Sequence, residues 1–213
     1  MLFRSAPVCD LDANRAVIGR RSHGSDVSQV GKLAAAFVRA TQARQVVATA
    51  KHFPGHGFAA GDKHKQLVFL DGGMPEIPVF RQAVEARVLM VMAGHIAVQN
   101  HPQYSTTGLP ASISPVILQG LLRDSLNFQG ITISDALNMG AVLNIREVAL
   151  KAFLAGCDMV MQPSSIKNYV ENLTAELEKS PQTRKQLETS VRRIVRLKIC
   201  LGLWPKSPAR KTL

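Results

Sequence analysis

Short apolar runs rich in Val, Ile and Met alternate along this chain of 213 residues with longer segments of helical periodicity. Runs that few polar residues interrupt are typical of strands buried on both faces of a sheet. Helices between such strands return the chain to the same end of the sheet, so that neighbouring strands run parallel. The pattern therefore predicts an α/β fold of parallel β/α units. The expected strands are residues 6–11, 46–51, 88–93, 131–135 and 159–162.

The helical segments between these runs carry recognisable start signals. Ser25 or Asp26 is suited to cap the first helix, and Ser114 followed by Pro115 is a typical pair for an N-cap and a first turn. The expected helices span residues 25–43, 76–86, 114–126, 146–155, 165–179 and 183–201.

Polar residues gather directly after the expected strands. The run KHFPGHG at residues 51–57 ends the second strand, Asp62 and His64 follow in the same loop, and Asp135 ends the fourth strand. The C-terminal ends of the strands form the active site in a β/α barrel. Imidazoles, a lysine and turn glycines together predict a site that holds a polar ligand and moves a proton. The polar connection at residues 97–110 is a candidate active-site loop.

The net charge of +11 first suggests a nucleic-acid partner. Nine of the basic residues but only one acidic residue, Glu188, lie from Pro181 onward, so the charge belongs mainly to the last helix and the tail. A basic outer face of a helix explains this distribution without any nucleic acid. We expect residues 1–204 to form one domain and residues 205–213 a basic tail.

Cysteine usage and hydropathy indicate a cytoplasmic protein. Cys9, Cys157 and Cys200 are odd in number and widely spaced, which favours reduced thiols over a disulfide framework. The sequence contains no apolar run of the length that a membrane helix requires, and its first residues lack the apolar stretch of a secretory signal. We therefore expect no membrane partner.

Several motifs, taken in order, resemble the bacterial β-N-acetylhexosaminidases of glycoside hydrolase family 3. The resemblance extends over nearly the whole chain, and the KHFPGHG run with its following Asp-x-His is its most specific part. The motifs are APVCD at residues 6–10, VIGRRS at 17–22, KHFPGHG at 51–57, Asp62 with His64, VMAGH at 91–95, PASIS at 110–114, FQGITISD at 128–135, AGCD at 155–158 and VRRI at 191–194.

This resemblance implies a (β/α)8 barrel of the TIM type, of which the chain matches roughly the last five β/α units. Chains of the family begin well before the position that matches Met1, so we expect an incomplete barrel that lacks two further sugar contacts. The two open sheet edges of such a fold invite self-association.

The resemblance also implies the reaction and its residues. The family releases terminal β-linked N-acetylglucosamine with retention during cell-wall turnover, and uses neither metal nor cofactor. By position, Asp135 matches the nucleophile, and His64 matches the general acid/base with Asp62 as its partner. Arg21, Lys51 and His52 match residues that hold the hydroxyl and acetamido groups of the sugar. The expected partner is therefore a carbohydrate, such as a muropeptide.

Other interpretations stay open at this stage. His52, His56, Asp62 and His64 are also zinc-ligand types, which would make a metal-dependent hydrolase. A second alternative is a catalytically silent remnant of the family. A third is a member of the family that prefers unsubstituted β-glucosides. Either water or phosphate is a reasonable acceptor of the glycosyl group. The sequence assigns no role to His56 and leaves His95 between a structural and a functional role.

Overall fold

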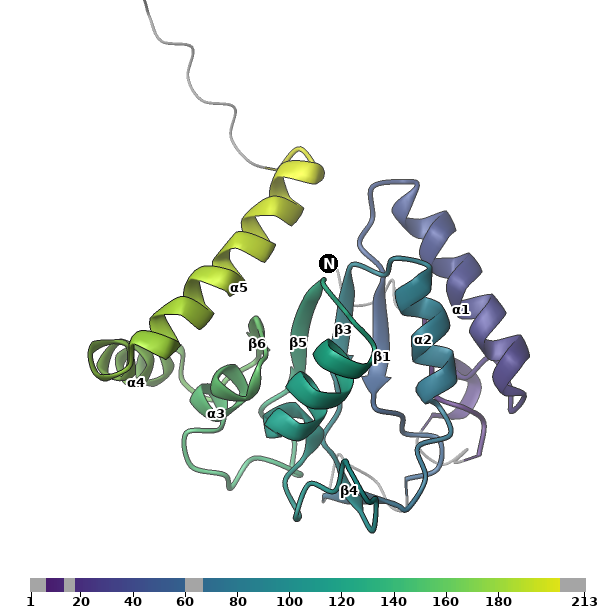
Figure 1. The fold of residues 1–213 in the computed structure, drawn as a ribbon, viewed down its shortest axis with the longest axis horizontal. Helices are drawn as coiled ribbons and strands as arrows, with labels where there is room; N and C mark the ends of the chain where they lie inside the picture. The colour runs from purple at the N-terminus through teal and green to yellow at the C-terminus, as the bar shows by residue number, and fades with distance from the viewer. Residues whose placement is uncertain (1–6, 14–17, 60–66, 204–213) are drawn as a thin grey trace, which may run out of the picture.

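The computed structural model describes residues 7–13, 18–59 and 67–203. Within these residues, one parallel sheet has the strand order β1-β3-β5-β6 (Figure 1). Four of the five expected strands are present in this sheet, so the predicted class of parallel β/α units is confirmed. The basic tail expected at residues 205–213 lies outside the described residues. The strands are β1 (Thr49–Phe53), β3 (Met90–Ala93), β5 (Ile131–Ala136) and β6 (Met159–Met161).

The first expected strand, at residues 6–11, is reduced to a single bridge in its described part. Val8 forms a parallel bridge with Lys51. The Cys9 N–H donates to the Lys51 carbonyl over 2.7 Å, and the Lys51 N–H donates to the Pro7 carbonyl over 3.3 Å. This segment therefore runs along the outer edge of β1 and covers it.

A second, two-stranded parallel sheet corrects the sequence prediction. It pairs β2 (Val68–Asp71) with β4 (Ile96–Gln99), beyond the C-terminal ends of β1 and β3 (Figure 1). The start of the expected active-site loop at residues 97–110 is thus a strand, of which Ala97 and Val98 are fully buried. The hydroxyl and N–H of Thr106 both bond to Val98, which holds the rest of that segment against β4.

The helices agree with the expected segments, with one correction at a helix start. Asp26 rather than Ser25 caps α1, because its carboxylate accepts the Gln29 N–H over 2.6 Å. Ser114 is not a side-chain cap: Pro115 occupies the cap position of η3, which has π-helical hydrogen bonding. None of the described helices combines the length and apolar character needed to cross a bilayer. The helices are α1 (Val27–Gln42), α2 (Ile77–Glu85), η3 (Val116–Ser125), α3 (Val148–Ala155), α4 (Ile166–Lys179) and α5 (Pro181–Cys200), with short 3-10 turns η1 (Gly19–Arg21) and η2 (Ala111–Ile113).

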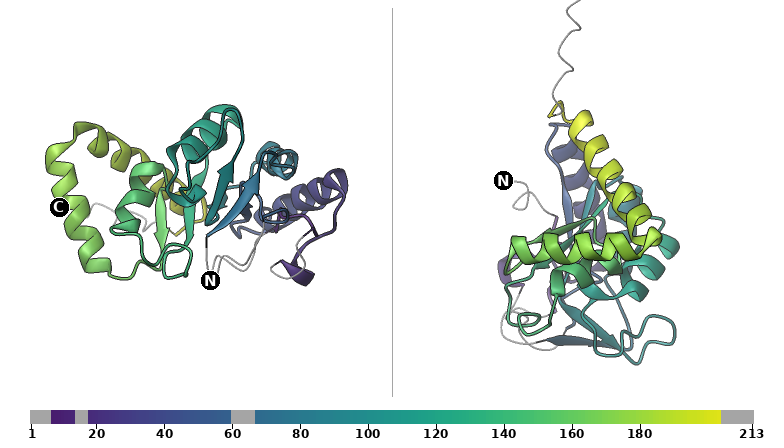
Figure 2. Two further views of the ribbon diagram at one scale, coloured as in Figure 1. Left: turned by 90° about the horizontal axis from the view of Figure 1, so that it is seen from below. Right: turned by 90° about the vertical axis from the view of Figure 1, so that its left-hand side faces the viewer.

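Different helices cover the two faces of the main sheet. Val91 belongs to the cluster that α1, α2 and η3 complete, whereas its neighbours Met90 and Met92 belong to a cluster on the other face. Ile194 and Leu197 of α5 pack against this second cluster. The result is an open arc, with α1 and α2 at one end and α4 and α5 at the other (Figure 2).

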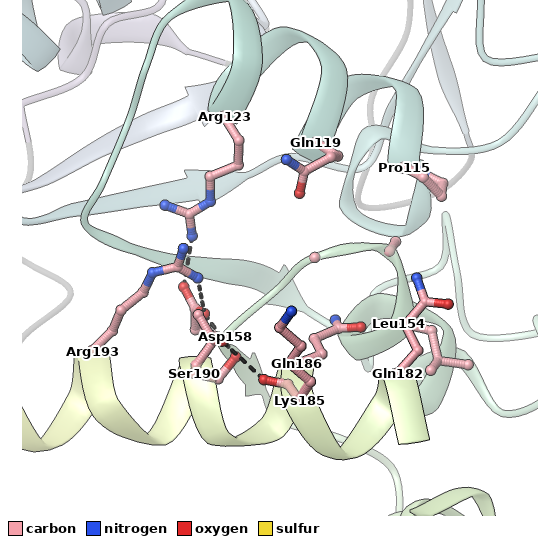
Figure 3. Close-up of a pocket in the computed structure, with 13 residues that line it drawn as sticks. Pro115, Gln119, Arg123, Leu154, Asp158, Gln182, Lys185, Gln186, Ser190 and Arg193 are labelled. Carbon is pink, nitrogen blue, oxygen red and sulfur yellow. Dashed lines mark hydrogen bonds and ion pairs between the residues drawn. The ribbon is translucent and has the colours of Figure 1, made fainter. Parts of the chain in front are cut away.

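A buried ion cluster attaches α5 to the N-terminal ends of β5 and β6 (Figure 3). The Asp158 carboxylate accepts from Arg123 over 2.7 Å, from Arg193 over 2.9 Å and from the Ser190 hydroxyl over 2.8 Å. It also accepts the Thr132 N–H over 2.9 Å. At least one basic residue of the last helix, Arg193, therefore bonds to a buried carboxylate of the fold. The cluster lines a cavity of about 410 Å³.

Candidate active site

Two strands carry an extra residue where the predicted site lies. Ala50 and Phe53 of β1 pair with Val91 and Ala93 of β3, so β1 has one residue more than its neighbour over this stretch. The same irregularity occurs in β5 between Ile133 and Ala136, opposite Met159 and Met161 of β6. A β-bulge re-aims side chains and is frequent beside active sites.

The bulges contain three of the residues singled out from the sequence. Lys51 and His52 lie in the bulge of β1, and Asp135 lies in that of β5. Lys51 is half-buried, whereas His52 is 4% exposed and Asp135 is 7% exposed. One carboxylate oxygen of Asp135 accepts the Ala136 N–H over 2.9 Å. The fold therefore places a nearly buried carboxylate and an imidazole at the same edge of one parallel sheet.

A carboxylate that sequence reasoning assigned no role, Asp10, organises the β1 end of the site. Asp10 is fully buried. It accepts the backbone N–H groups of His52 and His56 over 3.1 Å and 2.8 Å, and its other oxygen lies 2.7 Å from His52 Nδ1. One sequence signal could have identified Asp10: it is an acidic residue within an apolar segment that is expected to be buried. A buried carboxylate needs hydrogen-bond partners, so such a residue is a candidate for organising its surroundings.

The contact with Asp10 fixes the orientation of the His52 ring. A carboxylate oxygen accepts, so Nδ1 of His52 carries the proton in this bond. Nε2 is then the acceptor of the neutral ring and a second donor of the imidazolium. His52 can therefore exchange hydrogen bonds with a polar ligand while Asp10 holds it from behind.

Glu76 supports the turn that follows His52. Its Oε1 accepts the Gly57 N–H over 2.8 Å. A Cβ on Gly57 would come within 2.2 Å of the Leu11 carbonyl, and a Cβ on Gly55, whose φ is +133°, would come within 2.6 Å of the Glu76 carboxylate. Only glycine permits this approach, so these two glycines bring the turn against Glu76.

Burial, reinforced by the nearby charge of Asp10, raises the pKa of Glu76 to about 7. Glu76 ionises near pH 4.5 in the unfolded chain, so between these values the folded protein binds more protons. The free energy of unfolding therefore falls as the pH rises from about 4.5 and levels off above about 7. At 1.36 kcal/mol per pKa unit, this loss is roughly 3 kcal/mol.

We expect Glu76→Gln to remove this loss, because glutamine keeps the oxygen that accepts the Gly57 N–H. The variant should gain roughly 3 kcal/mol relative to the natural protein between pH 4.5 and pH 8, measured by urea unfolding. Glu85→Gln, at an exposed position of α2, is the control. A stability difference that does not change with pH would show that Glu76 titrates normally.

The remaining predicted residues are Arg21, in the short turn η1, and two residues outside the described part. Arg21 is exposed in η1, and its Nε donates to the Ile18 carbonyl over 3.2 Å. Asp62 and His64 both fall within residues 60–66, outside the described residues, so their approach to Asp135 stays a prediction.

The zinc interpretation finds no support in the described residues, where no three His, Cys, Asp or Glu side chains gather as a cation site. His52 and His56 are described, but Asp62 and His64, the other ligands of that interpretation, are not. His52 is instead engaged by Asp10.

Comparison with known proteins places this chain in one family. Residues 3–197 match the family model described as the glycosyl hydrolase family 3 N terminal domain. A Cellulomonas fimi protein named beta-N-acetylglucosaminidase/beta-glucosidase is 30% identical over 92% of this chain. A beta-hexosaminidase of Vibrio cholerae is 36% identical over 79% of it.

Solved structures agree with the sequence matches. The structure of a glycoside hydrolase family 3 beta-N-acetylglucosaminidase from Paenibacillus sp. superposes on 97% of this chain with a TM-score of 0.84 and 30% identity. This overlap confirms the predicted partial barrel. The chain spans 38% of the Cellulomonas protein, 51% of the Vibrio protein and 41% of the Paenibacillus structure.

Proposed function

The chain belongs to glycosyl hydrolase family 3, and we propose that it releases terminal β-linked N-acetylglucosamine with retention of configuration. The observation that carries this proposal is the position of Asp135, a nearly buried carboxylate in a strand bulge at the C-terminal edge of a parallel sheet. Active sites of β/α folds lie at this edge.

The proposed reaction proceeds in two displacements. The Asp135 carboxylate attacks the anomeric carbon, the glycosidic C–O bond breaks, and His64 gives its proton to the departing oxygen. Water then attacks the same carbon, His64 takes a proton from it, and the ester bond to Asp135 breaks. Asp62 orients the His64 ring and stabilises its imidazolium form.

Holding the sugar falls to residues around the β1 end of the site. Lys51 and His52, re-aimed by the bulge, donate to hydroxyl or acetamido oxygens, and Arg21 forms a forked pair of hydrogen bonds. Asp10 holds His52 from the buried side, so the ring is already oriented before the sugar arrives.

We place the substrate among cell-wall fragments and the reaction in the cytoplasm. The beta-hexosaminidase and beta-N-acetylglucosaminidase names of the relatives support an N-acetylglucosaminide as the substrate. Cys9, Cys157 and Cys200 are all free thiols, as expected in a reducing compartment. The name of the Cellulomonas protein also includes beta-glucosidase, so an unsubstituted β-glucoside is the second substrate to test.

The direct test is hydrolysis of chromogenic N-acetylglucosaminides, glucosides and a muropeptide by the full chain. We expect the N-acetylglucosaminide to be cleaved faster than the glucoside, and the released sugar to be the β-anomer by NMR. An α-anomer would contradict retention. If no sugar is released from any of these substrates, the chain is a catalytically silent remnant of the family.

His64→Ala is expected to slow hydrolysis in a way that depends on the leaving group. A substrate with a dinitrophenyl leaving group needs no proton, so its cleavage step should change little, whereas an alkyl or sugar leaving group should lose about 100-fold in rate. His23→Ala, at an exposed position, is the control. An equal loss of rate in the cleavage step of both substrates would show that His64 is not the proton donor.

We also infer that a second copy of the chain pairs with the free side of β6. Within the described residues β6 pairs only with β5, and Met159, Val160 and Met161 are all partly exposed. A strand edge of this kind presents unpaired N–H and C=O groups. Sedimentation velocity should show a dimer that Val160→Pro dissociates, and a monomer at all concentrations would contradict it.

A further inference from the structure

His95 connects the end of β3 to the end of β5. It is fully buried, two residues beyond the last residue of β3. Its Nδ1 lies 2.7 Å from the Ser112 hydroxyl, and its Nε2 lies 2.9 Å from the carbonyl oxygen of Ala136. Ala136 directly follows the proposed nucleophile, Asp135.

These two contacts define the protonation of the ring. A carbonyl oxygen can only accept, so Nε2 of His95 carries the proton and donates it to Ala136. In the neutral ring Nδ1 then accepts the hydroxyl proton of Ser112. Ser112 is itself buried, and its N–H donates to the Gly94 carbonyl over 3.1 Å, which ties it to the end of β3.

The carbonyl that His95 holds belongs to the residue that closes the β5 bulge. The Ala136 N–H donates to Asp135 Oδ1 over 2.9 Å. The next N–H, of Leu137, donates to the Met161 carbonyl over 2.9 Å. The peptide between Ala136 and Leu137 is therefore held by His95 on one side and by β6 on the other, and this anchors the residue whose N–H meets Asp135.

We propose that His95 is a positioning residue for Asp135: by holding the Ala136 carbonyl it keeps the bulge, and with it the Asp135 carboxylate, in the attacking orientation. A bulged residue is left out of the regular ladder, so the direction of its side chain depends on how the flanking residue is held. The inference rests on the proposed function, because Asp135 is the nucleophile only if the chain is a retaining glycosidase.

The first test uses the unmodified protein and needs no activity. Long-range 1H–15N NMR spectra of the imidazole rings distinguish the two neutral tautomers. We expect His95 to be protonated at Nε2, with Nδ1 as the acceptor. A ring protonated at Nδ1 alone could not hold the Ala136 carbonyl and would overturn the proposal.

The second test compares two substitutions that separate the contacts. In His95→Asn the amide reaches only as far as Nδ1 did, so it keeps Ser112 and loses Ala136. In His95→Gln the amide reaches as far as Nε2 did and can still donate to the Ala136 carbonyl. We expect the Ala136 amide proton to shift upfield and to exchange faster in the asparagine variant than in the glutamine variant.

Kinetics supply the catalytic part of the same comparison. We expect the asparagine variant to lose about 100-fold in kcat, with KM changed less than about 3-fold, because a small misplacement of a reacting group costs rate rather than ground-state binding. The glutamine variant should retain most of the natural kcat. Equal kcat values and equal Ala136 amide signals in the two variants would overturn the proposal.

The outcomes separate this inference from the proposed function. If the natural protein has no turnover, the proposed function fails while the tautomer and the Ala136 amide still decide whether His95 holds the bulge. If neither variant folds, the tautomer in the natural protein decides alone.

Discussion

Asp135→Asn abolishes turnover, with a loss of at least about 1,000-fold in kcat, if Asp135 is the nucleophile. Asparagine has nearly the same shape, and its side-chain oxygen can still accept the Ala136 N–H. The fold should therefore be kept, while the neutral amide can neither attack the anomeric carbon nor stabilise positive charge on it. The measurement is hydrolysis of the best chromogenic substrate, alongside thermal unfolding.

The matched control is Asp124→Asn, because Asp124 is exposed on η3 and its carboxylate accepts a surface bond from Gln119 that asparagine can also accept. This variant should keep its natural rate. Full activity of Asp135→Asn, in a protein of unchanged stability, would mean that another group attacks the sugar.

Asp10→Asn destabilises the protein by roughly 3 kcal/mol, because it leaves buried donors without the carboxylate that accepts their hydrogen bonds. The Asp10 carboxylate accepts two backbone N–H groups and the His52 ring, and an amide turned toward these donors has only one accepting oxygen. At 2–4 °C per kcal/mol for a chain of this size, the melting temperature should fall by roughly 10 °C.

Asp26→Asn provides the comparison for this stability measurement. Asp26 is an exposed N-cap, and asparagine caps helices about as well as aspartate. Its free energy of unfolding should change by less than about 0.5 kcal/mol. An Asp10→Asn protein as stable as Asp26→Asn would mean that Asp10 does not hold the turn after His52.

The sequence predicted the parts of the fold that depend on local pattern. The β-branched run that ends at Asp135 has the composition of a buried strand, and the structure shows a strand there with nearly every residue buried. Asp26, a residue type that favours the N-cap, caps α1. In contrast, β2 and β4 each follow a strand rather than a helix, so the alternation of strands and helices gave no signal for them.

Parts of the site could not be predicted because they depend on distant pairing. Asp10 lies 42 residues from His52, and no spacing rule connects an acid near the start of the chain to that imidazole. The bulges at Lys51–His52 and at Asp135 become visible only when β1 and β5 are aligned with their neighbours. His95 likewise acquires a role only through the Ala136 carbonyl, 41 residues away.

Covalent trapping tests the central claim most directly. An activated fluorosugar, a 5-fluoro N-acetylglucosaminide or a 2-fluoro glucoside, forms the glycosyl-enzyme quickly and releases it slowly, so the adduct can be located by peptide mass spectrometry. The account predicts one sugar per chain, attached to Asp135. Attachment to a different carboxylate, or the absence of an adduct from a protein that hydrolyses the parent glycoside, would contradict it.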